Sequence, residues 1–246
     1  MDTRIRENRL VRALFTLAVR LSDKLTVVSD AMRSVPGLAS ADVISSGVDT
    51  VFFTIQPDLS SKTILFTRSL EPVYDATTLI RSVPLVREKA ADVRFMIAGA
   101  GTQGELLRSL AHDLDVEGHV TFLGHVPHSD VPRLACRSRV FVSTALADGT
   151  SIALLEAMAA GLVPVATNIE ANRVLISHGQ DGYLFRPGDE QDLARNILRA
   201  LSGEISTQVL IQKKALLGER IPWSIIADRY VRSYNLLTAR HTRRDR

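Results

Sequence analysis

The residues best suited to chemistry lie in one stretch, from Ser143 to Gly161. An apolar run ends at Ser143, a polar loop follows, and helical periodicity begins near Thr150 or Ser151. The first backbone N–H groups of a helix have no partner within the helix and lie at the positive end of its dipole. Such groups bind a diphosphate well, and Gly149 lets the backbone approach it closely.

Two carboxylates flank this helix start. Asp148 stands just before the helix and Glu156 lies in its second turn. Glu156 is placed to accept hydrogen bonds from both hydroxyls of a ribose, and Asp148 from the hydroxyls of a sugar. The alternative is that Asp148 and Thr150 are ordinary capping residues and that Glu156 is a surface acid. These residues alone leave the two interpretations open.

Other candidate patterns are weaker. Gly99, Gly101 and Gly104 have the spacing of a dinucleotide-binding loop, but no acid ends the next strand to hold a ribose. His125 and His128 have a spacing seen in metal sites, but no cysteine or third ligand accompanies them, so a surface turn without metal is expected. Cys136, on a helix between Leu134 and the basic run Arg137–Arg139, is expected to pack in the interior and not to act as a nucleophile.

The elements that must position these residues alternate between strand and helix. Apolar runs bounded by turn signals predict strands at 25–29, 63–67, 93–98, 120–123, 140–143, 163–167 and 182–185. Helical periodicity predicts helices at about 75–90, 102–115, 129–137, 150–160 and 189–201. This alternation predicts an α/β fold: a doubly wound, Rossmann-like parallel sheet. Ligands of such sheets bind at the carboxyl ends of the strands.

Helical extensions are expected at both ends. Leu10, Leu14, Leu17 and Leu21 form one stripe of a helix, and residues 205–238 indicate two helices without a strand. We therefore expect three parts: an amphipathic helix at 1–22, a Rossmann-like domain with the candidate site residues at 23–204, and C-terminal helices with a basic tail at 205–246.

Composition narrows the classes of protein. Hydrophobic residues make up 46% and charged residues 23% of 246 residues, as in a soluble globular protein. A single cysteine favours a cytoplasmic location, and the net charge of +3 argues against nucleic acid as a partner. No apolar run spans a bilayer. Both ends are locally basic, which indicates a solvated helix face and tail or, alternatively, peripheral contact with the inner face of a membrane.

Asp148 and Glu156 have seven residues between them, and Glu156 begins the run Glu156-Ala-Met-Ala-Ala-Gly-Leu-Val-Pro-Val. In this pattern the chain resembles the retaining glycosyltransferases of family 4, whose GT-B architecture places the nucleotide-sugar donor on the C-terminal domain. Further matching motifs run in the family's order: Ser45-Ser-Gly-Val-Asp, Thr67-Arg-Ser-Leu, Ile97-Ala-Gly-Ala-Gly, Val120-Thr-Phe-Leu-Gly, Asp181-Gly-Tyr-Leu-Phe-Arg-Pro-Gly-Asp and Trp223-Ser-Ile-Ile-Ala-Asp-Arg-Tyr. The resemblance runs from about residue 20 to 236.

The resemblance implies a role for each matching residue. Arg68 would bind the donor diphosphate, Glu156 the nucleotide ribose and Asp148 the transferred sugar. The remaining donor-binding residues would be Gly99, Gly101, His125, Val126, Gly149, Thr150 and Ser151, with His125 and Val126 against the base. The implied reaction is metal-independent transfer with retention, from a UDP-sugar or GDP-sugar and without a cofactor, in surface polysaccharide or glycolipid synthesis.

Two departures from the family pattern affect the site. The family's lysine five or six residues after the arginine is missing, and Tyr74 would have to substitute for it. Where the family has Gly-Gly-x-x-Glu, this chain has Glu170-Ala-Asn-Arg-Val174, which would change the loop near the sugar.

The resemblance covers a donor half without its acceptor-binding domain. We expect that domain to come from a partner or from the rest of a longer protein, or the exposed end helices to form a homodimer. The isolated chain would then bind nucleotide sugar but turn it over poorly. A non-catalytic nucleotide-sugar-binding or scaffold subunit is an alternative, and an NAD-dependent oxidoreductase a remote one.

Overall fold

The apolar runs of the sequence form a parallel sheet in the computed structural model, which describes residues 9–244. Six strands pair in the order β5-β4-β3-β6-β7-β8, all in parallel. Their bounds are β3 (Thr63–Phe66), β4 (Arg94–Ala98), β5 (Val120–Gly124), β6 (Val140–Ser143), β7 (Val163–Thr167) and β8 (Tyr183–Phe185). The expected doubly wound α/β sheet is confirmed.

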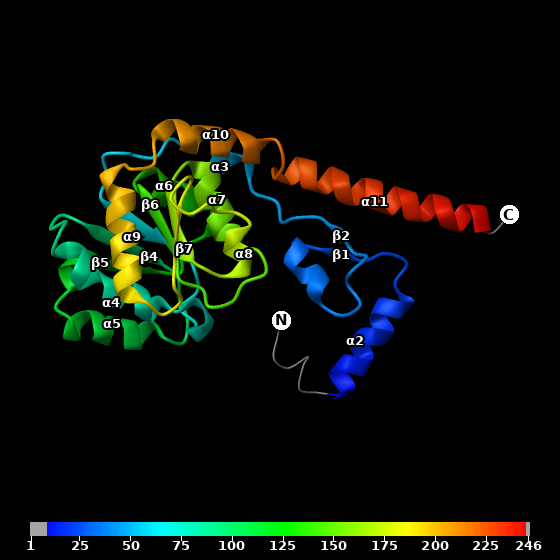
Figure 1. The fold of residues 1–246 in the computed structure, drawn as a ribbon, viewed down its shortest axis with the longest axis horizontal. Helices are drawn as coiled ribbons and strands as arrows, with labels where there is room; N and C mark the ends of the chain where they lie inside the picture. The colour runs from blue at the N-terminus through cyan, green and yellow to red at the C-terminus, as the bar shows by residue number, and fades with distance from the viewer. Residues whose placement is uncertain (1–8, 245–246) are drawn as a thin grey trace. The chain divides into compact units, whose positions relative to one another are not determined.

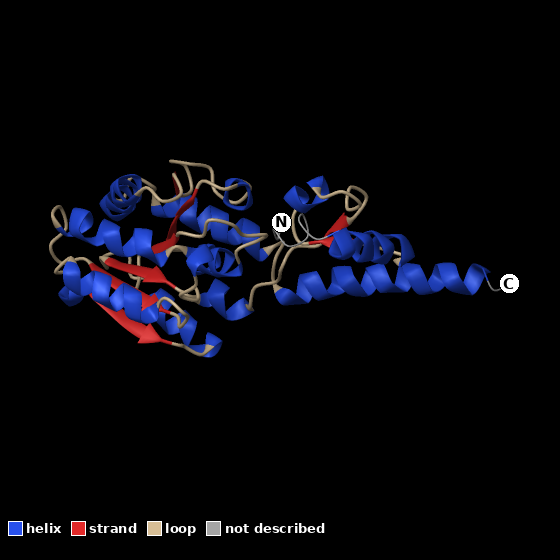
Figure 2. Ribbon diagram, turned by 90° about the horizontal axis from the view of Figure 1, so that it is seen from below, coloured by secondary structure: helices blue, strands red, loops and turns tan. Residues whose placement is uncertain are grey.

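Both faces of this sheet are covered, which explains why its strands are apolar throughout. Successive residues of a strand point to opposite faces, so Ile64 and Phe66 lie in one apolar cluster while Leu65 lies in the other. The first cluster is closed by α4 (Ala76–Arg87), α5 (Gly104–Asp113) and α9 (Glu190–Ser202), and the second by α3 (Thr50–Thr54), α6 (Val131–Cys136) and α7 (Ile152–Ala160). Figures 1 and 2 show these helices on the two sides of the strands.

The order of the strands creates a switch point. The chain passes from β3 to β4 and β5 on one side, and then returns to the other side of β3 with β6. Ligands of doubly wound sheets bind outside the carboxyl ends of the strands at such a point. The loops that follow β3 and β6, which contain Arg68 and Asp148, therefore meet there.

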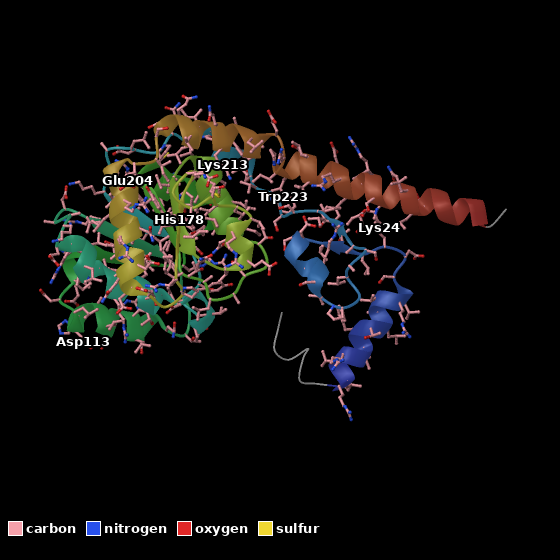
Figure 3. All side chains as sticks on the ribbon, viewed as in Figure 1. Lys24, Asp113, His178, Glu204, Lys213 and Trp223 are labelled. Atoms are coloured by element: carbon pink, nitrogen blue, oxygen red, sulfur yellow. The ribbon has the colours of Figure 1, made fainter. Side chains whose placement is uncertain are left out.

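The chain divides into two compact units. The larger, residues 48–222, contains this sheet, and the smaller combines residues 1–47 with 223–246. The Val48 amide donates to the Ile221 carbonyl at 2.8 Å, so the chain enters and leaves the larger unit at one place. Helix α10 (Thr207–Gly218) belongs to it: Leu217 packs in the second apolar cluster, and Lys213 Nζ lies 2.7 Å from Asp181 Oδ2. Figure 3 labels Lys213 on this helix.

The smaller unit contains α2 (Arg9–Leu21), β1 (Thr26–Val27), the 3₁₀ helix η1 (Asp30–Ser34), β2 (Asp42–Val43) and α11 (Trp223–Arg244). Phe15 and Val19 of α2 pack against its small core. The leucine row of α2 lies on another face of that helix, and its four side chains are exposed: Leu10 67%, Leu14 58%, Leu17 52% and Leu21 74%. Within the part of the chain that the structure describes, no helix is long and apolar enough to cross a membrane.

The boundaries of these units lie after residues 47 and 222, whereas the expected boundaries lay after residues 22 and 204. The strand expected at 25–29 does not join the large sheet, because Thr26–Val27 pairs in parallel with Asp42–Val43. The sequence analysis did not predict β2, since two residues are too few to show a periodicity. Residues 205–222 lie with the large sheet because α10 packs against α7.

Candidate functional site

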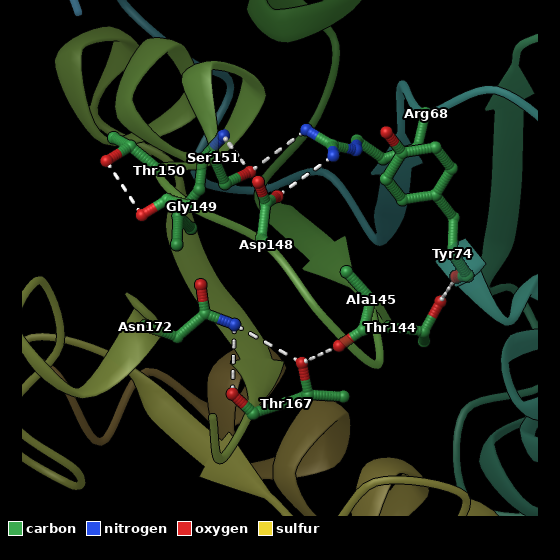
Figure 4. A network of polar contacts seen from close by, with 11 residues as sticks. Arg68, Tyr74, Thr144, Ala145, Asp148, Gly149, Thr150, Ser151, Thr167 and Asn172 are labelled. Atoms are coloured by element: carbon green, nitrogen blue, oxygen red, sulfur yellow. Dashed lines mark hydrogen bonds and ion pairs between the residues drawn. The ribbon is translucent and has the colours of Figure 1, made fainter. Parts of the chain in front are cut away.

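Arg68 is the centre of a charged cluster at the switch point. Its Nη2 lies 2.9 Å from Asp148 Oδ2, and its Nη1 donates to Ser151 Oγ at 3.3 Å. The Arg68 and Asp148 side chains are each only 13% exposed. The guanidinium stacks 4.1 Å from the centroid of the Tyr74 ring, a cation–π contact (Figure 4). These four residues come from two loops that lie about eighty positions apart in the sequence.

Helix α7 begins at this cluster. Ser151 is its N-cap, and the Ser151 hydroxyl oxygen accepts from the Leu154 amide at 3.2 Å. Asp148 pairs with Arg68 instead of capping the helix, and the Thr150 hydroxyl donates to the Gly149 carbonyl. Helix α7 begins at Ile152, directly after the expected start near Thr150 or Ser151. An arginine, a serine hydroxyl and the amides of a helix N-terminus converge there, as in sites that bind anions.

Glu156 is a buried acid and not the surface acid of the alternative interpretation. The residue is 7% exposed, and its Oε1 lies 2.7 Å from His128 Nε2. Burial raises the pKa of Glu156, while the His128 contact lowers it and the charge of Asp49 raises it further. A carboxylate with a raised pKa at the edge of a switch point is a candidate for function.

His128 was not a predicted site residue. It begins a 3₁₀ turn, η4 (His128–Asp130), and its side chain is 62% exposed, so the expected surface turn is present. Its link to Glu156 crosses 28 positions of sequence. The available signal was its place in the loop after β5, at the sheet edge where the other candidates were expected.

Threonine and asparagine side chains hold the loops of this edge together (Figure 4). The Thr144 hydroxyl donates to the Tyr74 carbonyl at 2.6 Å, and the Thr167 hydroxyl donates to the Ala145 carbonyl at 2.5 Å. Asn172 Nδ2 donates to the Thr167 carbonyl at 2.9 Å. The Asn172 side-chain carbonyl is buried without a partner among the described residues. The segment that departs from the family pattern thus supplies an acceptor next to the Thr167 bonds.

Gly99 and Gly101 have a packing explanation. A Cβ at Gly99 would lie 2.0 Å from the Arg68 carbonyl oxygen, and one at Gly101 would lie 2.5 Å from the Leu70 carbonyl oxygen. The Leu70 amide also donates to the Ala100 carbonyl at 3.0 Å. These glycines therefore let the loop after β4 press against the segment that contains Arg68.

The remaining candidates lie in the loop after β5. Gly124 has a φ of 67°, which turns the chain sharply at the end of the strand. His125 is exposed and Val126 half-buried, and neither makes a hydrogen bond with the described residues of the Arg68 or Glu156 clusters. Cys136, expected in the interior, is exposed at the last position of α6, because Ala135 faces the core. Across residues 9–244 no three His, Cys, Asp or Glu side chains are grouped to hold a metal ion.

Solved structures give the class of the fold, that of the GT-B glycosyltransferases. The Anabaena protein HepE, solved in complex with UDP and glucose, matches 91% of this chain and 66% of its own with a TM-score of 0.79 and 20% identity. Sucrose-phosphate synthase from Thermosynechococcus elongatus matches 97% of this chain and 64% of its own with a TM-score of 0.81 and 16% identity. At these identities the likeness shows the fold alone.

Sequence comparison gives the family. Residues 48–216 match the model of the glycosyl transferases group 1, and the chain belongs to this family. The phosphatidyl-myo-inositol mannosyltransferase of Mycobacterium leprae is 31% identical over 198 residues, which are 78% of this chain and 52% of the relative. The glycogen synthase of Mycobacterium tuberculosis is 29% identical over 210 residues, 82% of this chain and 51% of the relative. The chain thus spans about half the length of these relatives.

Proposed function

We propose that this chain is the donor-binding half of a retaining glycosyltransferase and that it binds a nucleoside-diphosphate sugar at the switch point. The observation that supports this most is the cluster of Arg68, Asp148 and Ser151 at the N-terminus of α7, with buried Glu156 one turn further on. Family membership and the UDP bound to the fold neighbour HepE agree with it.

Each group has a task in this proposal. Arg68 and the first amides of α7 bind the diphosphate, and they stabilise the charge that develops on it as the bond to the anomeric carbon breaks. Asp148 accepts from hydroxyls of the transferred sugar, and Glu156 from the ribose. Gly99 and Gly101 act indirectly, since they allow the close packing that places Arg68. His125 and Val126 lie against the base. No metal and no cofactor take part.

The acceptor is held by another domain or partner in this proposal. Transfer requires donor and acceptor to be held together, so the isolated chain binds donor and turns it over slowly. A surface polysaccharide or a glycolipid is the proposed product, made at the inner face of a membrane. A nucleotide-sugar-binding subunit without catalysis is the second candidate, favoured by the absence of the family's lysine five or six residues after Arg68.

The test is a thermal-shift titration with UDP, GDP, ADP and NAD, on the native chain and on Glu156→Ala. A ligand that binds only the folded state raises the melting temperature. We expect one of UDP and GDP to raise it, with a much smaller rise in the variant. A shift with NAD alone would support the oxidoreductase instead. Slow hydrolysis of the donor sugar separates a transferase from a non-catalytic subunit.

A further inference from the structure

His128 and Glu156 come from different elements and meet at one hydrogen bond. His128 lies in η4 after β5, and Glu156 lies on α7 after β6; Nε2 and Oε1 are 2.7 Å apart. With Glu156 ionised, the imidazole Nε2–H donates to the carboxylate. The His128 ring also lies against Phe52, with 5.6 Å between ring centroids and 48° between planes. The imidazole is therefore held from two sides, by an acid and by an aromatic ring.

Few described groups near Glu156 can stabilise its carboxylate other than His128. Among the described residues, His128 is the hydrogen-bond partner of the Glu156 carboxylate. The other ionisable group that faces it is Asp49, the N-cap of α3, whose side chain accepts from the Val51 amide at 3.1 Å. Lys214 of α10 donates to the Ile55 carbonyl and packs near Gly161, at the far end of α7. The strands beneath α7 contribute apolar side chains. The buried Glu156 carboxylate, which faces the Asp49 carboxylate, thus depends on the His128 imidazole for its hydrogen bond.

We infer that His128 is a positioning residue that holds Oε1 of Glu156 and leaves Oε2 to accept a ribose hydroxyl of the bound nucleotide. This inference rests on the proposed function, because it assigns Glu156 to the ribose. His128 itself does not touch the ligand. It fixes the rotamer of Glu156 and favours the ionised form, which is the form that accepts two hydrogen bonds.

The inferred role of His128 predicts how nucleotide affinity depends on pH. Burial raises the pKa of Glu156 and the His128 contact opposes that rise. As pH falls, Glu156 gains a proton and loses acceptor capacity, so nucleotide affinity falls on the acid side. Without His128 the pKa of Glu156 rises further. In a plot of nucleotide affinity against pH, the fall in affinity on the acid side, here called the acid limb, then moves to higher pH.

The experiment compares His128→Ala and His128→Gln by calorimetric titration from pH 5 to 8. The probes are UDP and GDP, and the 2′,3′-dideoxy form of whichever binds. His112→Ala is the matched control, because His112 Nδ1 also lies 3.1 Å from a carboxylate, that of Glu117, on the exposed end of α5. Thermal unfolding verifies that each variant is folded.

We expect His128→Ala to weaken binding of the ribonucleotide about tenfold at pH 7.5, the usual effect of losing one charge-assisted hydrogen bond. Its acid limb should lie at higher pH. The dideoxy nucleotide should bind both forms equally. Glutamine, whose amide reaches the same oxygen, should restore affinity at pH 7.5 but not the native acid limb. The His112→Ala profile should match the native one.

Different failures point to different conclusions. If His128→Ala binds the ribonucleotide as tightly as the native chain, or loses equal affinity for the dideoxy form, the inference is wrong while the proposed function stands. If the native chain binds neither UDP nor GDP, the proposed function fails and the inference fails with it. Should the alanine variant not fold, the comparison of glutamine with the native chain decides by the position of the acid limb.

Discussion

At the scale of single residues, the site consists of two pairs, each of one carboxylate and one basic side chain. Arg68 pairs with Asp148, and His128 pairs with Glu156. The sequence analysis predicted Asp148 and Glu156 as site residues from their places around a helix start, and Arg68 from the family resemblance. It assigned the three to different parts of a ligand. It did not predict the pairs, because each pair joins segments distant in sequence that only the order of the strands brings together.

The pairing of Arg68 predicts that Asp148 competes with a diphosphate for the guanidinium. In Asp148→Asn the charge-assisted bond is lost, and Arg68 is free to bind the anion. We expect the affinity for the nucleoside diphosphate to rise about tenfold, since such a bond is worth about 1.5–3 kcal/mol and 1.4 kcal/mol is tenfold. The gain should be smaller for the nucleotide sugar, which loses an acceptor for its hydroxyls. Calorimetry with both ligands measures this difference.

The control for this variant is Asp181→Asn, which removes the partner of Lys213 within the same unit and away from the switch point. It should lower the melting temperature and leave nucleotide affinity unchanged. Equal affinity of Asp148→Asn and the native chain for the diphosphate would contradict the competition.

The raised pKa of Glu156 predicts a dependence of stability on pH. A carboxyl group with a higher pKa in the folded state favours folding when protonated, and that contribution is lost as pH rises through the folded-state pKa. Glu156→Gln should therefore be more stable than the native chain at pH 8 by about 1 kcal/mol, seen as a melting temperature about 2–4 °C higher. At pH 4 the two should unfold alike. A destabilised variant at pH 8 would show that the His128 bond outweighs the burial of the charge.

At the scale of elements, most strands and helices were predicted from periodicity. Strands β3 to β8 lie within two residues of the expected ranges, because strands covered on both faces are apolar throughout. The turn η2 (Pro72–Tyr74) was missed, although it places the Tyr74 ring under Arg68. The Tyr74 carbonyl of this turn accepts from the Thr144 hydroxyl, a contact between distant loops that local propensity does not report.

The N-cap of α7 predicts an effect that separates stability from binding. Ser151→Ala removes the bond to the Leu154 amide and the contact with Arg68. Ser206→Ala removes only the cap of α10, where the side chain accepts from the Val209 amide. Each should lose about 1 kcal/mol of unfolding free energy. Nucleotide affinity should fall only in Ser151→Ala, by calorimetry. Unchanged affinity in that variant would remove Ser151 from the site.

At the scale of the whole molecule, the leucine row of α2 is an exposed apolar surface next to Arg9, Arg12 and Arg20. Its spacing was evident in the sequence. The sequence analysis did not identify the other apolar face of α2, formed by Phe15 and Val19, which packs against the small core. Large exposed apolar patches mark sites of association.

This surface predicts self-association of the isolated chain. The mass from light scattering should rise with concentration, and the double variant Leu14→Gln, Leu17→Gln should shift the profile toward the monomer. Leu106→Gln is the control, since Leu106 is 58% exposed, alone, on α5 of the larger unit. A monomer at every concentration in the native chain would argue against a dimer through this row.

The hydrogen bond from Val48 to the Ile221 carbonyl has a consequence for how such chains are assembled. A segment whose first and last residues are neighbours can be cut out of one polypeptide and spliced into a surface loop of another without stretching either. Residues 48–222 are such a segment, and they contain the Arg68 and Glu156 clusters together. The Arg68 and Glu156 clusters can thus be inherited together, while the protein around them changes.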